Sequence, residues 1–238
     1  MATKPPVFQT IGKSLIESAV ELYRSLGFSM IIDLIWFVAY MPLIIVVNIC
    51  LPQIHQTGDV ISIATLLLGF FCIWNSLVSG PFVTTIFAFY QERKVDYPNF
   101  KGLVKLFKKF YVRSVNISGI FSIGISLLAM NIIMAIITKQ ILFLIAGIIS
   151  LYILLFIMMM SFYFNPLIQL DNSFKKVLRK SFLLVSDNLG ISFCIIIILG
   201  MILALCIQFS FLFILVYGPI FIYFSDRGFE AVYNQYEL

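Results

Sequence analysis

Asp33 is the first residue to consider for a chemical role, because it is the only carboxylate well inside a long apolar stretch. A charged group within lipid is costly, so such a residue is a candidate functional position. Asp33 lies near the start of the apolar stretch 28–51, however. The alternative is a structural role at the membrane interface, with a bond to Arg24 or to a neighbouring helix. We favour the structural role and keep Asp33 as a candidate.

The residue types that carry most catalytic and metal chemistry are scarce. His55 is the only histidine, and neither a Ser–His–acid set nor a glycine-rich phosphate loop accompanies it. The cysteines lie in or beside apolar stretches and form no C-x-x-C pair: Cys50, Cys72, Cys194 and Cys206. Buried thiols of this kind behave as small hydrophobes. The sequence therefore predicts a protein without catalytic residues, cofactor or metal, and an intramembrane enzyme is the least favoured function.

Three short elements combine a proline with a small or polar residue: SGPFVTTIFAFY, YFNPLIQL and YGPIFIYF. Their candidate kink positions are Gly80, Pro81, Asn165, Pro166, Gly218 and Pro219. A proline inside a helix removes a hydrogen-bond donor and leaves the carbonyl four residues earlier in need of a partner. Broken helices line binding sites in transporters, and prolines also make ordinary kinks. We favour ordinary kinks, supported by Thr84, Thr85 or a neighbouring helix.

The composition assigns the chain to a membrane. Of its 238 residues, 61% are hydrophobic and 11% are charged, and the mean hydropathy is +1.05; a soluble domain is about 25% charged. A helix needs roughly 20 apolar residues to cross the hydrocarbon core. The stretches long enough are 28–51, 60–90, 116–138, 141–163 and 190–224. We divide the last stretch near Gln208 into a short hairpin, which gives about six spans in an all-α bundle.

Positive charge assigns the two faces of the membrane. All of the 16 Lys and Arg residues except Lys139 fall in four polar stretches: the N-terminal segment, 91–115, 164–189 and the C-terminal tail. Cytoplasmic segments carry such an excess. The sequence therefore predicts a multi-pass protein of the cytoplasmic membrane with both termini cytoplasmic. The net charge of +5 indicates contact with anionic headgroups on that face, and a nucleic-acid partner is not expected.

Two of the basic stretches are amphipathic. Leu103, Leu106, Phe107 and Phe110 form one helical stripe, and a second stripe includes Val177. The basic cluster beside them is Lys101, Lys105, Lys108, Lys109, Arg113, Lys175, Lys176, Arg179 and Lys180. An apolar stripe flanked by positive charge suits a helix in the headgroup region. We favour such a lipid-facing brace, and the alternative is a docking surface for a cytoplasmic partner such as an ATPase.

The same unit recurs along the chain: an amphipathic segment, an apolar hairpin and a proline element. We place the copies at 10–90, 99–168 and 172–236 within one membrane domain that spans 1–238. Echoes produced by composition alone are the alternative. Small residues also recur at every fourth position, as Ser76, Gly80, Thr84 and Ala88 and as Ser118, Ser122 and Ser126. These stripes predict close helix contacts rather than a permeation path.

The stretch GPFVTTIFAFYQERKVDYPNFKGLVKLFKKFYVRS resembles the signature region of the YesL-like family, small bacterial membrane proteins of uncharacterised function. That region joins a proline-bearing helix, a short basic turn and an amphipathic segment. YFNPLIQLDNSFKKVLRKSFLLVSDNLGISF is similar to a later region of the family, and the resemblance covers residues 20–224. It supplies no catalytic residues. It implies an accessory role, since family members often accompany carbohydrate ABC transporters.

Two functions remain in view. The first is a non-enzymatic scaffold or accessory subunit that binds a protein partner or a second copy of itself, which short loops and absent catalytic groups favour. The second is a small transporter or an ABC-type permease subunit, which six spans and a basic loop for ATPase docking would suit. Solute flux that depends on Asp33 or on the proline elements would separate the two.

Overall fold

The computed structural model describes residues 7–93, 100–170, 173–208 and 217–233, and these fold into helices joined by turns. In chain order the helices are α1 (Val7–Arg24), α2 (Leu26–Thr57), α3 (Val60–Trp74), the π-helical turn η1 (Asn75–Ser79), α4 (Gly80–Arg93), α5 (Phe100–Thr138), α6 (Ile141–Gln169), α7 (Phe174–Asp187), α8 (Leu189–Gln208) and α10 (Gly218–Tyr233). The described ranges contain no strand, which confirms the predicted all-α class.

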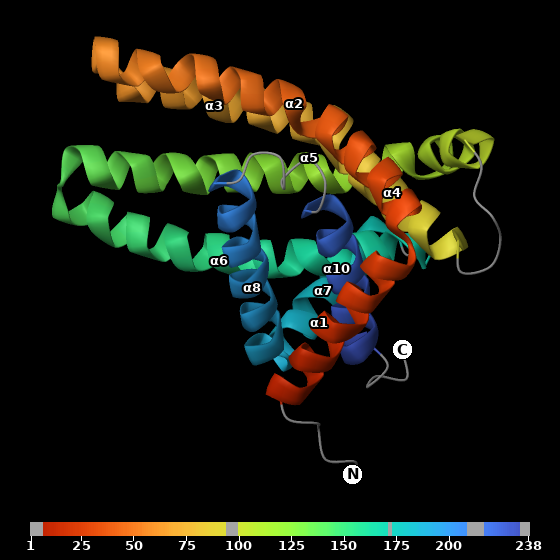
Figure 1. Ribbon diagram of the computed structural model, residues 1–238. Helices are drawn as coiled ribbons and strands as arrows, with labels where there is room; N and C mark the ends of the chain where they lie inside the picture. The colour runs from red at the N-terminus through yellow and green to blue at the C-terminus, as the bar shows by residue number, and fades with distance from the viewer. Residues whose placement is uncertain (1–6, 94–99, 171–172, 209–216, 234–238) are drawn as a thin grey trace.

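Two long hairpins, α2–α3 and α5–α6, extend to the same side of the molecule, and α1, α8 and α10 cross below them (Figure 1). The first hairpin turns at Gly58, whose φ of 70° suits glycine and whose amide donates to the Ile54 carbonyl at 3.0 Å. Asp59 then caps α3 by accepting a hydrogen bond from the Ser62 amide at 3.1 Å. The helix therefore runs to Thr57, so the residues after the apolar stretch 28–51 are helical up to that point, and the loop expected between residues 51 and 60 is confined to Gly58 and Asp59.

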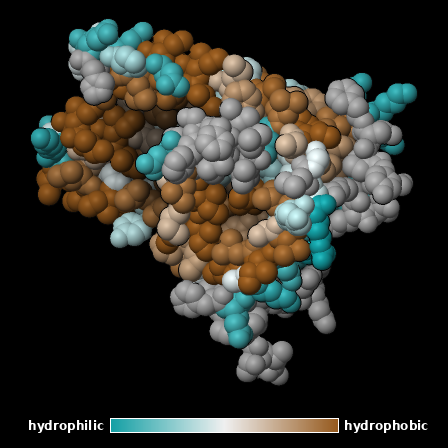
Figure 2. All heavy atoms as spheres, viewed as in Figure 1, coloured by the Kyte–Doolittle hydropathy of each residue, from teal (hydrophilic) through white to brown (hydrophobic). Residues whose placement is uncertain are grey.

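The second hairpin turns where the sequence predicted, at 138–140. Helix α5 ends at Thr138, Lys139 has a positive φ of 54°, and α6 begins at Ile141. Hydrophilic residues gather at the tips of both hairpins, and hydrophobic residues cover the length between (Figure 2). This distribution suits helices whose ends reach water and whose middles lie in lipid.

Four described segments are long and apolar enough to cross a membrane: 27–54, 60–92, 101–138 and 141–169. The pair α7–α8, bent by 96°, would make a fifth. The chain thus has the helices of a multi-pass membrane protein. Helix α8 is described as far as Gln208, and residues 209–216, where the last apolar stretch was predicted to turn as a hairpin, lie outside the described residues. Helix α10 is not among the four segments.

The predicted apolar stripes are covered by protein. Leu103, Leu106 and Phe110 of α5 are at most 8% exposed, and Val177 and Val185 of α7 are fully buried. All five belong to one hydrophobic core, to which α1, α6, α8 and α10 also contribute. The prediction that these stripes face lipid was therefore wrong. Periodicity shows only that one face is apolar, and lipid or protein can cover it.

The amphipathic segment at 99–116 was expected to form an interfacial helix separate from the third span. Instead, α5 continues without a break from Phe100 to Thr138. At 1.5 Å per residue its 39 residues extend about 58 Å, which exceeds the hydrocarbon core by roughly 28 Å. Residues 100–138 contain no proline that would break the helix. The basic first part of α5 is therefore the rigid continuation of an apolar helix.

Candidate functional site

A pocket lined mainly by apolar side chains, with hydroxyl and amide groups among them, lies where the proline elements approach one another. Its volume is about 180 Å³, and residues of α2, η1, α4, α5, α6 and α10 line it. Gly80 of the first proline element, Asn165 of the second and Phe221 of the third are among them. The structure thus brings together parts of elements that are far apart in the sequence. Pro81, Pro166, Gly218 and Pro219 do not line the pocket.

Hydrogen bonds between side chains join three helices at this pocket. The Thr84 hydroxyl of α4 lies 2.8 Å from the Asn165 amide oxygen of α6, to which it can donate. The Ser114 hydroxyl of α5 lies 2.8 Å from the same Thr84 oxygen. Thr84 and Ser114 are 1% and 2% exposed. The three groups satisfy one another inside an apolar bundle, where an unpaired polar group would be costly.

The small-residue stripes lie at the contact between α5 and the helix that precedes it. The Ser118 hydroxyl of α5 donates to the Ser76 carbonyl at 3.1 Å. One turn further on, the Asn75 amide nitrogen donates to the Ser122 hydroxyl at 2.7 Å. At Gly80 helices α4 and α5 approach so closely that an added Cβ would clash with the Cβ and Oγ of Ser118, and it would also stand 2.9 Å from the Asn75 carbonyl oxygen of the preceding π-helical turn. These stripes therefore form helix contacts, as predicted.

The π-helical turn directly precedes Pro81, and a neighbouring helix supplies the partner that the sequence predicted. Proline has no amide hydrogen for the carbonyl four residues earlier, that of Leu77. The hydroxyl of Tyr111 on α5 donates to this carbonyl at 3.3 Å. The Thr85 hydroxyl donates to the Pro81 carbonyl at 2.7 Å. Pro219 is different, because it stands in the first turn of α10, where a missing amide hydrogen costs little.

Asp33 is buried at 1% exposure and links α2 to the start of α10. Its Oδ1 accepts a hydrogen bond from the Gly218 amide at 3.1 Å. Its Oδ2 has no hydrogen-bond partner among the described residues. A bond to a neighbouring helix is thus confirmed, whereas the alternative bond to Arg24 was wrong. A carboxylate at the first turn of a helix also suits the helix dipole.

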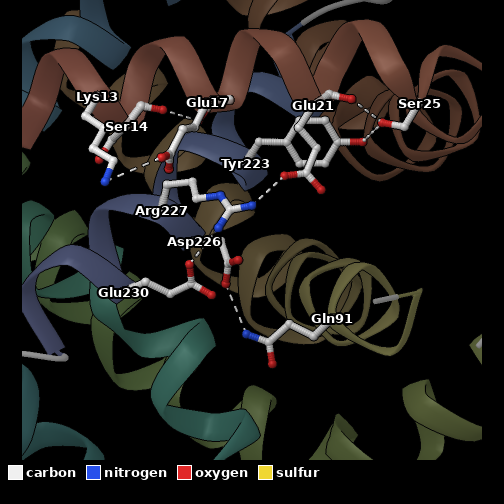
Figure 3. A network of polar contacts seen from close by, with 11 residues as sticks. Lys13, Ser14, Glu17, Glu21, Ser25, Gln91, Tyr223, Asp226, Arg227 and Glu230 are labelled. Atoms are coloured by element: carbon white, nitrogen blue, oxygen red, sulfur yellow. Dashed lines mark hydrogen bonds and ion pairs between the residues drawn. The ribbon is translucent and has the colours of Figure 1, made fainter. Parts of the chain in front are cut away.

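Charged side chains form a second cluster, between α1, α4 and α10 (Figure 3). The Arg227 guanidinium of α10 donates to Glu21 of α1 at 2.9 Å and to Glu230 at 2.9 Å. Beside it, the Gln91 amide of α4 donates to Asp226 at 3.0 Å. Burial by itself lowers the pKa of Arg227, but the hydrogen bond to Glu21 and the charge of Glu230 outweigh it and raise that pKa above its usual value.

In the sequence analysis, Arg227 counted only as a positive charge of the C-terminal tail, and this cluster was not predicted. The available signal was the Asp-Arg-x-x-Glu pattern directly after an apolar stretch, since Arg227 and Glu230 share a helix face. Nothing in the sequence identified Glu21 as the third member. Near the cluster, the Tyr223 hydroxyl lies 3.0 Å from the Ser25 hydroxyl and 2.9 Å from that of Ser29, which ties α10 to the junction of α1 and α2.

The predicted basic cluster lies on the outside of α5 and α7. Eight of its nine members are exposed, and Lys180 is partly buried: Lys101, Lys105, Lys108, Lys109, Arg113, Lys175, Lys176, Arg179 and Lys180. Lys109 covers the ring of Phe110 at 4.9 Å. The apolar stripes behind these side chains belong to the protein core. The lysines and arginines thus lie on the outer surface of α5 and α7, while the apolar stripes of the same helices pack against other helices of the protein.

Within the described ranges, no group of three or more His, Cys, Asp or Glu side chains is placed to hold a metal ion. Comparisons with protein-family models, with curated proteins and with solved structures found no match to this chain.

Proposed function

We propose that this protein is a non-enzymatic membrane scaffold or accessory subunit that docks a second protein on the basic face of α5 and α7. The observation that carries the proposal is the burial of both apolar stripes in the protein's own core, with 5% exposure at Leu106 and 0% at Val177. An amphipathic helix holds itself at a membrane by inserting its apolar face. Here that face is already packed, so the exposed lysines are available to an acidic protein surface.

The proposal extends to the architecture and its setting. The six spans and three repeats inferred from the sequence place α5 and α7 at equivalent positions, each opening one repeat, so that two basic helices act together on the cytoplasmic face. The resemblance to the YesL-like family makes a subunit of a carbohydrate ABC transporter a reasonable partner. Most described polar side chains of the bundle bond to backbone carbonyls or to one another, which suits a structural role better than a solute path.

The test is purification from native membranes in a mild detergent. We expect a partner to copurify with the natural protein and to be lost from the variant Lys105→Gln/Lys109→Gln/Lys175→Gln/Lys176→Gln. The matched control is Lys139→Gln, which removes an exposed lysine from the other end of α5. Equal recovery of the partner with both variants would contradict docking on α5 and α7. A purified monomer that transports a solute into liposomes unaided would refute the accessory role.

One observation favours a second function, transport. The pocket of about 180 Å³ is lined by residues of all three proline elements and of a π-helical turn, and π-helical turns are frequent at functional sites. Transport predicts that Asn165→Ala, which changes the pocket lining, or Asp33→Asn, which lies outside that lining, changes solute flux in liposomes. Unchanged flux in both variants would leave the accessory role as the better account.

A further inference from the structure

A cavity of about 450 Å³ opens between α1 and α10, beside the charged cluster. Glu17, Glu21 and Arg24 line it from α1, and Arg227 lines it from α10. The apolar side chains of Ile16 and Val20 complete the cavity wall on α1. Figure 3 shows Glu17 and Glu21 pointing from α1 toward the side on which Arg227 lies.

The charges that line this cavity are not equally occupied. Arg227 and Glu21 bind one another at 2.9 Å and are each about a quarter exposed. Among the residues that the structure describes, Glu17 has only a distant ion pair, with Lys13 at 3.9 Å. Arg24 is exposed and has no ion-pair partner among the described residues. One carboxylate and one guanidinium therefore remain available in the same cavity.

The position of the cavity identifies the environment of its ligand. Arg24 and Ser25 directly precede the segment 27–54, which is long and apolar enough to cross the membrane. The cavity therefore lies at the depth of the lipid headgroups. Ile16 and Val20 are 68% and 43% exposed, so apolar surface lies beside the charges. A ligand with charged groups and an attached apolar part fits this combination.

We propose that the cavity binds the headgroup of a zwitterionic phospholipid that carries a primary amine. The phosphate lies against Arg24, because guanidinium groups bind phosphate oxygens by paired hydrogen bonds. The ammonium lies against Glu17, to which it can donate, and the acyl chains leave over Ile16 and Val20. Glu17 and Arg24 are two turns apart on one helix face, about 10 Å along the axis, and both side chains are long enough to shorten that distance.

The two carboxylates decide against other headgroups. An anionic headgroup without an amine would leave Glu17 unpaired and would lie close to two negative charges. A choline headgroup is zwitterionic but has no N–H to donate to a carboxylate. Free phosphoethanolamine has the right charges and lacks the acyl chains that the apolar wall would contact. The site thus distinguishes lipids by the amine.

The test is native mass spectrometry of the full chain in detergent with phosphatidylethanolamine, phosphatidylcholine and phosphatidylglycerol of identical acyl chains. We expect phosphatidylethanolamine to bind about tenfold more tightly than phosphatidylcholine, the effect of one charge-assisted hydrogen bond. Glu17→Gln should abolish this preference, and Arg24→Gln should weaken both lipids about tenfold. Lys13→Gln, on the same helix and outside the cavity lining, is the control: it removes the cation that lies 3.9 Å from Glu17, so the preference for phosphatidylethanolamine should be kept or increased.

Three results would overturn the proposal: equal binding of the three lipids, strongest binding of phosphatidylglycerol, or the same loss in Lys13→Gln as in Glu17→Gln. Displacement of the lipid by an equal concentration of soluble glycerophosphoethanolamine would contradict a lipid ligand. All three positions are exposed or half-exposed on α1, so the variants should fold. Circular dichroism of each variant checks this directly.

Discussion

Replacing Gly80 by alanine tests the close contact between α4 and α5 at the pocket that the proline elements line. The new Cβ would stand 2.9 Å from the Asn75 carbonyl oxygen and closer than that to the Cβ and Oγ of Ser118. Backbone and a short side chain cannot move away as the end of a long side chain can. Overpacking of this kind costs about 1–3 kcal/mol, and the better helix propensity of alanine returns up to about 1 kcal/mol. We expect a net loss of about 1–2 kcal/mol.

Unfolding in mixed micelles of a mild detergent and sodium dodecyl sulfate, followed by circular dichroism, measures this loss. Ser118→Gly removes the opposing side chain, so adding Gly80→Ala to the Ser118→Gly protein should cost less than adding it to the natural protein, although the contact with the Asn75 carbonyl oxygen remains in both. Gly124→Ala is the control, because its Cβ would meet only Ile157 at an ordinary 4.0 Å. A Gly80→Ala protein as stable as the Gly124→Ala protein would refute the close approach of α4 and α5.

Three further variants test the contacts between distant segments, each by the same unfolding measurement. Asp33→Ala leaves the Gly218 amide without its acceptor and should cost about 1–3 kcal/mol, whereas Asp33→Asn keeps an acceptor oxygen and should cost less; equal losses would contradict that bond. Arg227→Gln should cost about 1–3 kcal/mol because it removes the cation that binds the carboxylates of Glu21 and Glu230, and adding Glu21→Gln should restore part of that; purely additive losses would argue against the ion pair. Tyr111→Phe removes the donor to the carbonyl freed by the first proline and should cost about 1 kcal/mol or less; no change would show that this bond is unimportant.

Local features of the fold could be predicted from the sequence because they depend on nearby residues. The turn at 138–140 follows from three polar residues between two apolar stretches. The need for a partner near Pro81 follows from proline's missing amide hydrogen. In each instance the signal lies within one or two helical turns of the feature it predicts.

Features that depend on distant residues could not be predicted in the same way. Asp33 and Gly218 are 185 positions apart, and the sequence contains nothing that pairs them. The stripe containing Leu106 has the same spacing whether lipid or protein covers it. Only the packing of α1, α6 and α10 shows that protein covers it. Arg227 fitted the excess of positive charge expected on the cytoplasmic face, and nothing in the sequence indicated that it binds Glu21.

The central claim is that a membrane sorts this chain so that the basic faces of α5 and α7 lie on one side and the α5–α6 turn on the other. Single cysteines at positions 105, 176 and 139, in a chain whose own cysteines are replaced, can be labelled with a membrane-impermeant maleimide in intact cells and in inverted vesicles. We expect positions 105 and 176 to react only in inverted vesicles and position 139 only in intact cells. Reaction of positions 105 and 176 from opposite sides would contradict both the arrangement of spans and the proposed docking face.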